Sequence, residues 1–145
     1  MRGLTLVELI LVVGVLTVLL VLGFSSLSSF RKSTDLTAGT EIVLATFSEA
    51  RSKTLSSEGL SQWGVHLSGD AIALFKGVTY NPLDAATRVR GLPSTVLLTW
   101  NVGGGSDVVF DRLTGATSQP GTLALTLYGA SESKVINILA SGITY

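Results

Sequence analysis

The sequence predicts an α+β protein in which a long N-terminal helix packs on a C-terminal antiparallel β-sheet domain. An apolar run begins at Leu9, and no charged residue stands between Glu8 and Arg31. Apolar residues then recur at helical spacing as far as Ala50. After Gly59 the chain changes to short alternating segments separated by Gly, Ser and Asp. The first two patterns predict the helix, and the third predicts the strands.

The apolar run predicts a helix that enters a membrane. A helix of about 20 mostly apolar residues spans a bilayer core of roughly 30 Å. Glu8 stands at the head of this run, and a charge near the bilayer centre costs roughly 3 kcal/mol on insertion scales. An acid in this place calls for a functional explanation. Thr5 and Glu8 also have the spacing of a capping box, in which each side chain satisfies a free N–H at the helix start.

The stretch from Gly3 to Glu8 resembles the processing signal of type IV prepilins and type II secretion pseudopilins. In that family a short basic leader ends in Gly, and prepilin peptidase cuts after it and N-methylates the new N-terminus. An acid is the fifth residue of the mature chain. The resemblance implies a leader over residues 1–3, cleavage between Gly3 and Leu4, and N-methylation of Leu4. Thr5 and Glu8 would then serve assembly.

Two other interpretations of this stretch stay open. One is an ordinary secretory signal, cut at a small-x-small site such as Gly23-Phe24-Ser25. The other is a plain single-pass anchor. Glu8 and the length of the apolar run disfavour the secretory signal. Charge alone favours the opposite orientation to that of a prepilin, because Arg2 is outweighed by Arg31 and Lys32. The resemblance implies a cytoplasmic N-terminus.

Composition limits the remaining possibilities. The chain has 145 residues, with ten basic and ten acidic side chains and no cysteine. This length predicts one compact domain in addition to the anchor. A neutral balance does not suggest strong non-specific binding to nucleic acid. Without cysteine there is no disulfide framework, no thiolate nucleophile and no thiolate metal site.

The segment after the apolar run is amphipathic. Residues 4–30 form the first half of the predicted helix, and residues 31–57 form the half that belongs to the globular domain, 31–145. A stripe of Leu36, Val43, Phe47 and Ala50 predicts the face that packs against this domain. Gly39 weakens the middle, so a kink there is an open alternative. Gly59 is a plausible C-terminal cap.

The β part is predicted over residues 60–145. Segments 62–67 and 71–75 flank a short loop at Ser68-Gly69-Asp70 and predict a hairpin. A long loop is expected from Lys76 to Pro93. Further strands are expected at 95–100, 107–110, 122–128 and 134–140, with Gly103-Gly104-Gly105 as a turn. Leucines alternate with small residues over 122–128, which is typical of a half-buried strand.

This β part resembles the GspH/FimT group of pseudopilins and minor pilins. The resemblance rests on the order of several short motifs: 63–67 (WGVHL), 74–77 (LFKG) with Tyr80, 109–115 (VFDRLTG), 121–125 (GTLAL), 136–138 (INI) and 142–143 (GI). The resemblance implies a pilin-like fold, with a long helix laid against antiparallel sheets.

No catalytic, cofactor or metal site is expected. His66 is the sole histidine and is interpreted as a surface or packing residue. Asp70, Asp84, Asp107 and Asp111 lack the spacing of a calcium loop. No G-x-S-x-G elbow occurs, and the glycine run at 103–105 is not followed by the Lys of a phosphate loop.

The sequence-based hypothesis is a structural, non-enzymatic filament subunit of a type IV pilus or a type II secretion-like system. The resemblance implies an inner-membrane precursor with prepilin peptidase, other pilins, an assembly platform and lipid as partners, which moves to a periplasmic or cell-surface filament. Two alternatives are a competence pilin that binds DNA and a membrane-anchored β domain. Lys76, Arg88 and Arg90 are the basic residues that bear on DNA, and the tail 136–145 has none. We therefore do not expect nucleic acid as a partner.

Overall fold

The computed structural model describes residues 5–129 and 131–145, with the side chains of all of these except residues 22–30. Its elements are α1 (Leu6–Leu55), a 3-10 turn η1 (Glu58–Leu60), β1 (Trp63–Leu67), β2 (Ala71–Lys76), β3 (Arg88–Gly91), β4 (Val96–Val102), β5 (Asp107–Val109), β6 (Gly121–Leu127) and β7 (Ser133–Ile138). The α+β class with antiparallel sheets is therefore confirmed. The chain divides into two compact units at Thr34/Asp35, and each is described by itself.

The predicted apolar stripe is the face of α1 that packs in the globular unit. Leu36, Val43, Phe47 and Ala50 are all buried. Gly39 lies on the same face, where a Cβ atom would come within 3.3 Å of Leu125 Cδ2 on β6. No kink occurs at this glycine, because α1 is continuous through it. Its small size instead permits a close approach between helix and sheet.

The helix ends earlier than its predicted cap. Ser57, with φ of 52°, is the first left-handed residue after Leu55, whereas Gly59 lies inside η1 with φ of 65°. A left-handed residue just past the last turn is the usual way in which a helix stops. Thr54 secures the following segment, since its hydroxyl accepts a 2.9 Å hydrogen bond from Trp63 N.

The strands form two antiparallel sheets, with strand orders β3-β2-β1-β5 and β4-β6-β7. The predicted β1–β2 hairpin is confirmed, with Val65 opposite Leu74. The strands expected at 122–128 and 134–140 are present as β6 and β7, and they pair with Leu123 opposite Ile136. Leu123, Leu125 and Leu127 on β6 are buried, as their alternation predicts.

One expectation about the strands is wrong. The long loop from Lys76 to Pro93 contains β3, an edge strand that pairs with β2. The predicted turn at 103–105 is present and leads from β4 in one sheet to β5 in the other. Alternation identifies a strand and its buried face but says nothing about its partner, which depends on packing across the domain.

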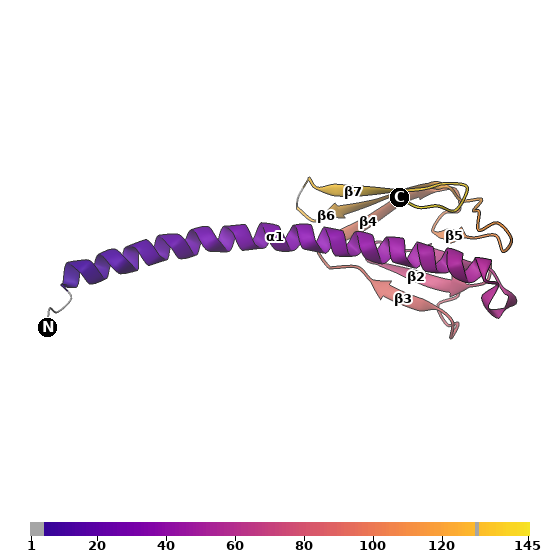
Figure 1. The fold of residues 1–145 in the computed structure, drawn as a ribbon, viewed down its shortest axis with the longest axis horizontal. Helices are drawn as coiled ribbons and strands as arrows, with labels where there is room; N and C mark the ends of the chain where they lie inside the picture. Colours follow the sequence, from indigo (N-terminus) through magenta and orange to yellow (C-terminus); the bar gives the residue numbers. More distant parts are fainter. Residues whose placement is uncertain (1–4, 130) are drawn as a thin grey trace. The chain divides into compact units, whose positions relative to one another are not determined.

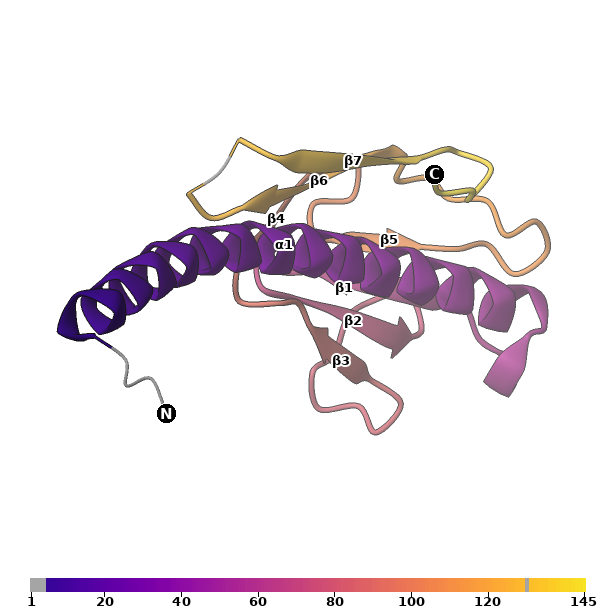
Figure 2. The same ribbon diagram turned by 60° about the vertical axis from the view of Figure 1, so that its left-hand side comes forward.

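One core joins the two sheets to the second half of α1. Figures 1 and 2 show β4, β6 and β7 on one side of that half of the helix and β2 and β3 on the other. Phe47 of α1 meets Phe110 edge-on, with ring centroids 6.3 Å apart and an interplanar angle of 89°. Both sheets thus present their inner faces to the helix, while Tyr80 packs on the outer face of the first sheet against Phe75.

Among the helical residues whose side chains are described, no stretch is both long enough and apolar enough to cross a membrane.

Candidate functional site

The first described turn of α1 contains half of the predicted capping box. Glu8 N donates to Thr5 Oγ1 at 3.3 Å, and Leu9 N donates to Thr5 O at 3.2 Å. Thr5 is therefore the N-cap residue. Within the described residues, the Glu8 carboxylate has no hydrogen-bond or ion-pair partner. The proposed cleavage position between Gly3 and Leu4 lies outside the described residues.

The segment that follows Glu8 carries its apolar side chains on every side of the helix. Each leucine, isoleucine and valine from Leu6 to Val21 is between 49% and 76% exposed. A helix that is apolar all round is normally buried inside a protein or a membrane. Exposed apolar patches beyond a few hundred Å² mark interaction sites in soluble proteins. We call residues 6–21 the apolar segment. We expect its exposed side chains to be buried by contact with another molecule or with lipid.

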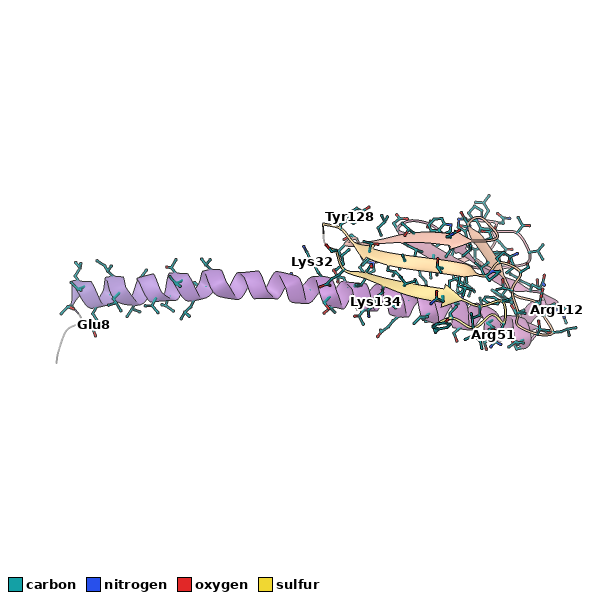
Figure 3. The ribbon with its side chains drawn as sticks, turned by 90° about the horizontal axis from the view of Figure 1, so that it is seen from above. Glu8, Lys32, Arg51, Arg112, Tyr128 and Lys134 are labelled. Carbon is teal, nitrogen blue, oxygen red and sulfur yellow. The ribbon has the colours of Figure 1, made fainter. Side chains whose placement is uncertain are left out.

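The apolar segment leaves one polar group without an internal partner. The Thr17 hydroxyl donates to Val13 O at 2.8 Å, so it is satisfied within the helix. Glu8 is the only charged residue between positions 6 and 21. In an environment without water, a carboxylate there needs a cation or hydrogen-bond donors supplied by another molecule. Figure 3 shows Glu8 at the start of the helix.

His66 belongs to an aromatic contact and not to a ligand cluster. Its ring lies 3.9 Å from that of Tyr80 with an interplanar angle of 4°, and its Nδ1 is 2.5 Å from Asp107 Oδ1. Tyr80 also packs against Phe75 at 5.7 Å. These contacts fasten the loop 77–87 to the outer face of the first sheet. In the described part of the chain, no three His, Asp or Glu side chains group around a possible metal position.

Of the basic residues that bear on DNA binding, Arg90 is the one held closely by other parts of the domain. Arg90 lies 2.5 Å from Glu49 of α1 and donates to Thr46 Oγ1 at 3.0 Å. Arg88 lies 4.0 Å from the same carboxylate. Lys76 stands at the end of β2, beside Gly59. Arg88 and Arg90 were expected in the loop 76–93, whereas in the structure they lie on β3, and Arg90 attaches this strand to α1.

Arg51 was not identified from the sequence as a functional or structural centre. Its Nε donates to Gly115 O at 3.1 Å, which attaches the turn after β5 to α1. Beside it runs a groove of about 300 Å³, lined by Leu44, Ser48, Arg51, Gly142, Ile143 and Thr144. No local sequence signal links Arg51 to Gly115, because they are 64 positions apart.

Comparison with known proteins adds no identification, since no family model, curated protein or solved structure matches this chain.

Proposed function

We propose that this protein is a structural subunit of a pilus-like filament, a minor pilin or pseudopilin of a type IV pilus or type II secretion-like system. The observation that carries the proposal is the apolar segment. It is exposed on all sides, begins with a single carboxylate, and continues through one helix into a folded β domain. In this proposal the apolar segment attaches the β domain to the membrane and then to the filament.

The apolar segment is buried by different surroundings before and after assembly. Burying a leucine or valine side chain gains roughly 1.5–3 kcal/mol relative to leaving it exposed. Lipid covers the segment in the inner-membrane precursor, with the N-terminus on the cytoplasmic side. Apolar side chains from neighbouring subunits cover it in the filament. Both covers suit the same helix, because neither requires polar groups on its surface.

The second step concerns Glu8. If prepilin peptidase cuts after Gly3 and methylates Leu4, the new N-terminus carries an amine. The Glu8 carboxylate attracts the amine of a neighbouring subunit, and low dielectric strengthens that attraction. Desolvation removes much of the gain, so the pair contributes more to docking position than to total affinity. Thr5 holds the first turn in helical form during this step.

The function proposed is therefore assembly and not catalysis. Partners would be the processing peptidase, other pilins, an inner-membrane assembly platform and lipid. A DNA-uptake role is less well supported, because Arg90 is paired with Glu49, which leaves Lys76 and the exposed Arg88 as the basic residues for phosphate contacts. A plain membrane anchor accounts for the apolar segment equally well but gives the Glu8 carboxylate no role.

Glu8→Gln separates the filament subunit from the plain anchor. Gln at this position keeps the backbone N–H that Thr5 caps, but its side chain cannot pair with an amine as a charge. We expect the variant to insert and be cleaved as the wild type is, yet to be lost from sheared filaments and from crosslinked complexes with other pilins. Thr17→Val is the matched control, since it alters a polar side chain of the same segment without changing charge.

Membrane-fraction and filament-fraction abundance are measured together for both variants. Loss of Glu8→Gln from the filament fraction alone supports assembly. Equal abundance of wild type and Glu8→Gln in both fractions would contradict an assembly role for the Glu8 charge. A mature N-terminus near Ser25 in mass spectrometry would contradict the pilin proposal as a whole.

A further inference from the structure

Four side chains form one row across the outer face of the sheet β4-β6-β7. Asn101 on β4 is opposite Thr122 on β6, and Thr122 is opposite Asn137 on β7. Tyr145 extends the row, because Asn137 and Tyr145 exchange backbone hydrogen bonds of 2.9 and 3.2 Å. Neighbouring strands are about 4.8 Å apart, so the row contains an evenly spaced amide, hydroxyl, amide and phenol. We call it the outer row.

The outer row faces away from α1. Leu123 and Ile136, the sequence neighbours of Thr122 and Asn137, are buried against the helix side of the sheet. Since successive side chains of a strand point to opposite faces, the row residues point outward. Tyr145 is 64% exposed. Figure 3 looks onto this sheet from the side opposite α1.

The polar groups of the outer row are not used within the fold. Among the described residues, the side chains of Asn101, Thr122, Asn137 and Tyr145 form no hydrogen bond. A shallow depression of about 180 Å³ lies beside the row, lined by Thr99, Trp100, Asn101, Thr122 and Ala124. The row therefore offers a set of donors and acceptors next to a recess.

The side chains that surround the outer row on the three strands carry no charge. The other outward positions of the three strands are Leu97, Thr99, Ala124, Thr126, Ser133 and Val135. A charged ligand would find no opposite charge here, and duplex DNA is bound chiefly through Lys and Arg. A protein partner would be expected to find a larger apolar centre than this face provides. A neutral ligand rich in hydroxyl groups is the best chemical match.

We propose that the outer row binds a neutral oligosaccharide. An amide side chain both donates and accepts hydrogen bonds, as a sugar hydroxyl does. A tyrosine supplies an apolar ring, against which the C–H face of a pyranose packs, together with a polar end. The spacing of neighbouring strands is close to the length of one pyranose ring, so consecutive sugars meet consecutive members of the row. The depression is shallow, so a single site binds weakly.

This inference does not rest on the proposed filament role. If the protein does assemble through α1, however, the row stays on the free side of the domain. Many copies along a filament would then present repeated sites, and linked weak sites bind a polymer with much higher avidity than one site alone. The proposed ligand in that setting is a neutral polysaccharide.

The test uses the full chain in a zwitterionic detergent that contains no sugar headgroup. Maltotriose, cellotriose and tri-N-acetylchitotriose serve as probes and are titrated while the side-chain amide signals of Asn101 and Asn137 are followed by NMR. We expect saturable shifts of both signals with at least one probe. Asn137→Ala and Tyr145→Ala should weaken binding several-fold, whereas Tyr145→Phe keeps the ring and should retain most of it.

Val135→Thr is the control on the same face, outside the outer row, and should leave binding unchanged. Each variant is checked for an unchanged melting temperature, so that loss of binding is not loss of fold. Absence of shifts with all three probes at tens of millimolar would overturn the inference. So would equal binding by wild type, Asn137→Ala and Tyr145→Ala. Shifts that depend on protein concentration without sugar would assign this face to a second copy of the chain, which also overturns it.

Discussion

Gly64 shows how one missing side chain organises the outer face of the first sheet. It lies opposite Phe75 in the β1–β2 pair. A Cβ atom at position 64 would come within 2.6 Å of Phe75 Cζ and 2.9 Å of Val108 O. The phenyl ring therefore covers the glycine, and Tyr80 packs against that ring in turn. An aromatic side chain packed across a glycine on the neighbouring strand is a known way to stabilise such a strand position.

Gly64→Ala should destabilise the globular unit by roughly 1–3 kcal/mol, the usual cost of forcing extra atoms into a packed site. Chemical unfolding of a fragment that starts near Arg31 measures the effect. Shortening the opposing ring in the double variant Gly64→Ala/Phe75→Leu should recover part of the loss. If the losses in unfolding free energy of the two single variants simply add in the double variant, the new methyl group does not clash with the Phe75 ring.

Phe47 is the most informative core residue of α1. It is 1% exposed and meets Phe110 edge-on. Phe47→Ala removes buried area and leaves a cavity under both sheets, so we expect a loss of about 3–5 kcal/mol in the free energy of unfolding. Phe47→Leu keeps most of the volume and should cost clearly less. A loss under about 1 kcal/mol for the alanine variant would mean that the core closes around the gap.

At the scale of elements, the sequence predicts what local spacing controls. The period of Leu36, Val43, Phe47 and Ala50 identifies the buried face of α1 correctly, and alternation identifies that of β6. Strand β3 was missed because it has only four residues and follows a loop with no alternation. Its attachment depends on Arg90 meeting Glu49, two residues that are 41 positions apart.

The candidate site could be predicted only in part, because the sequence shows local spacing and not the contacts between distant residues. The motif ending at Glu8 is contiguous, so the capping contact with Thr5 could be predicted. The outer row could not, because Asn101, Thr122 and Asn137 become neighbours only through the registers of two strand pairs. Register depends on which faces are buried across the whole sheet.

Arg90 and Glu49 give a test of how β3 is held. The pair is only partly exposed and Arg90 also reaches Thr46, so it should contribute more than an open surface pair. We expect a coupling of roughly 0.5–3 kcal/mol in a double-mutant cycle of Glu49→Gln and Arg90→Gln, measured by chemical unfolding. A coupling near zero would show that β3 is held by its backbone ladder with β2 alone.

The C-terminal segment is attached by a close contact between two glycines. A Cβ atom at Gly142 would overlap the carbonyl oxygen of Gly115, and Gly142 itself has φ of 76°. Both facts disfavour any other residue there. Gly142→Ala should detach the segment that pairs with β7 while the central strands persist. Faster hydrogen exchange at Leu139 and Tyr145, with β1 and β2 unchanged, is the expected result; uniform acceleration would indicate global destabilisation instead.

At the scale of the whole molecule, the two units have opposite surface chemistry. Among the residues whose side chains are described, every member of the core cluster lies after position 35, and the cluster joins α1 to both sheets. The apolar segment contributes nothing to that core, since its leucines, valines and isoleucine are all exposed. Folding of the globular unit and the proposed attachment through the apolar segment therefore depend on different residues of one helix.

This separation predicts different behaviour for two forms of the chain. A fragment that begins near Arg31 retains the whole core, so it should be a soluble monomer with mixed α and β circular dichroism. The full chain should require detergent or lipid, because water would otherwise contact the entire apolar segment. Light scattering and melting curves of both forms, with and without detergent, measure this difference.

Adding EDTA should leave the melting temperature of the fragment unchanged, and a fall of many degrees would reveal an ion that contributes to the fold. A fragment that is unfolded or aggregated would show that residues before position 31 stabilise the domain. It would contradict the conclusion that folding depends only on the second half of α1 and the sheets. A full chain that stays monomeric without detergent would remove the physical basis for placing its apolar segment in lipid or in a filament.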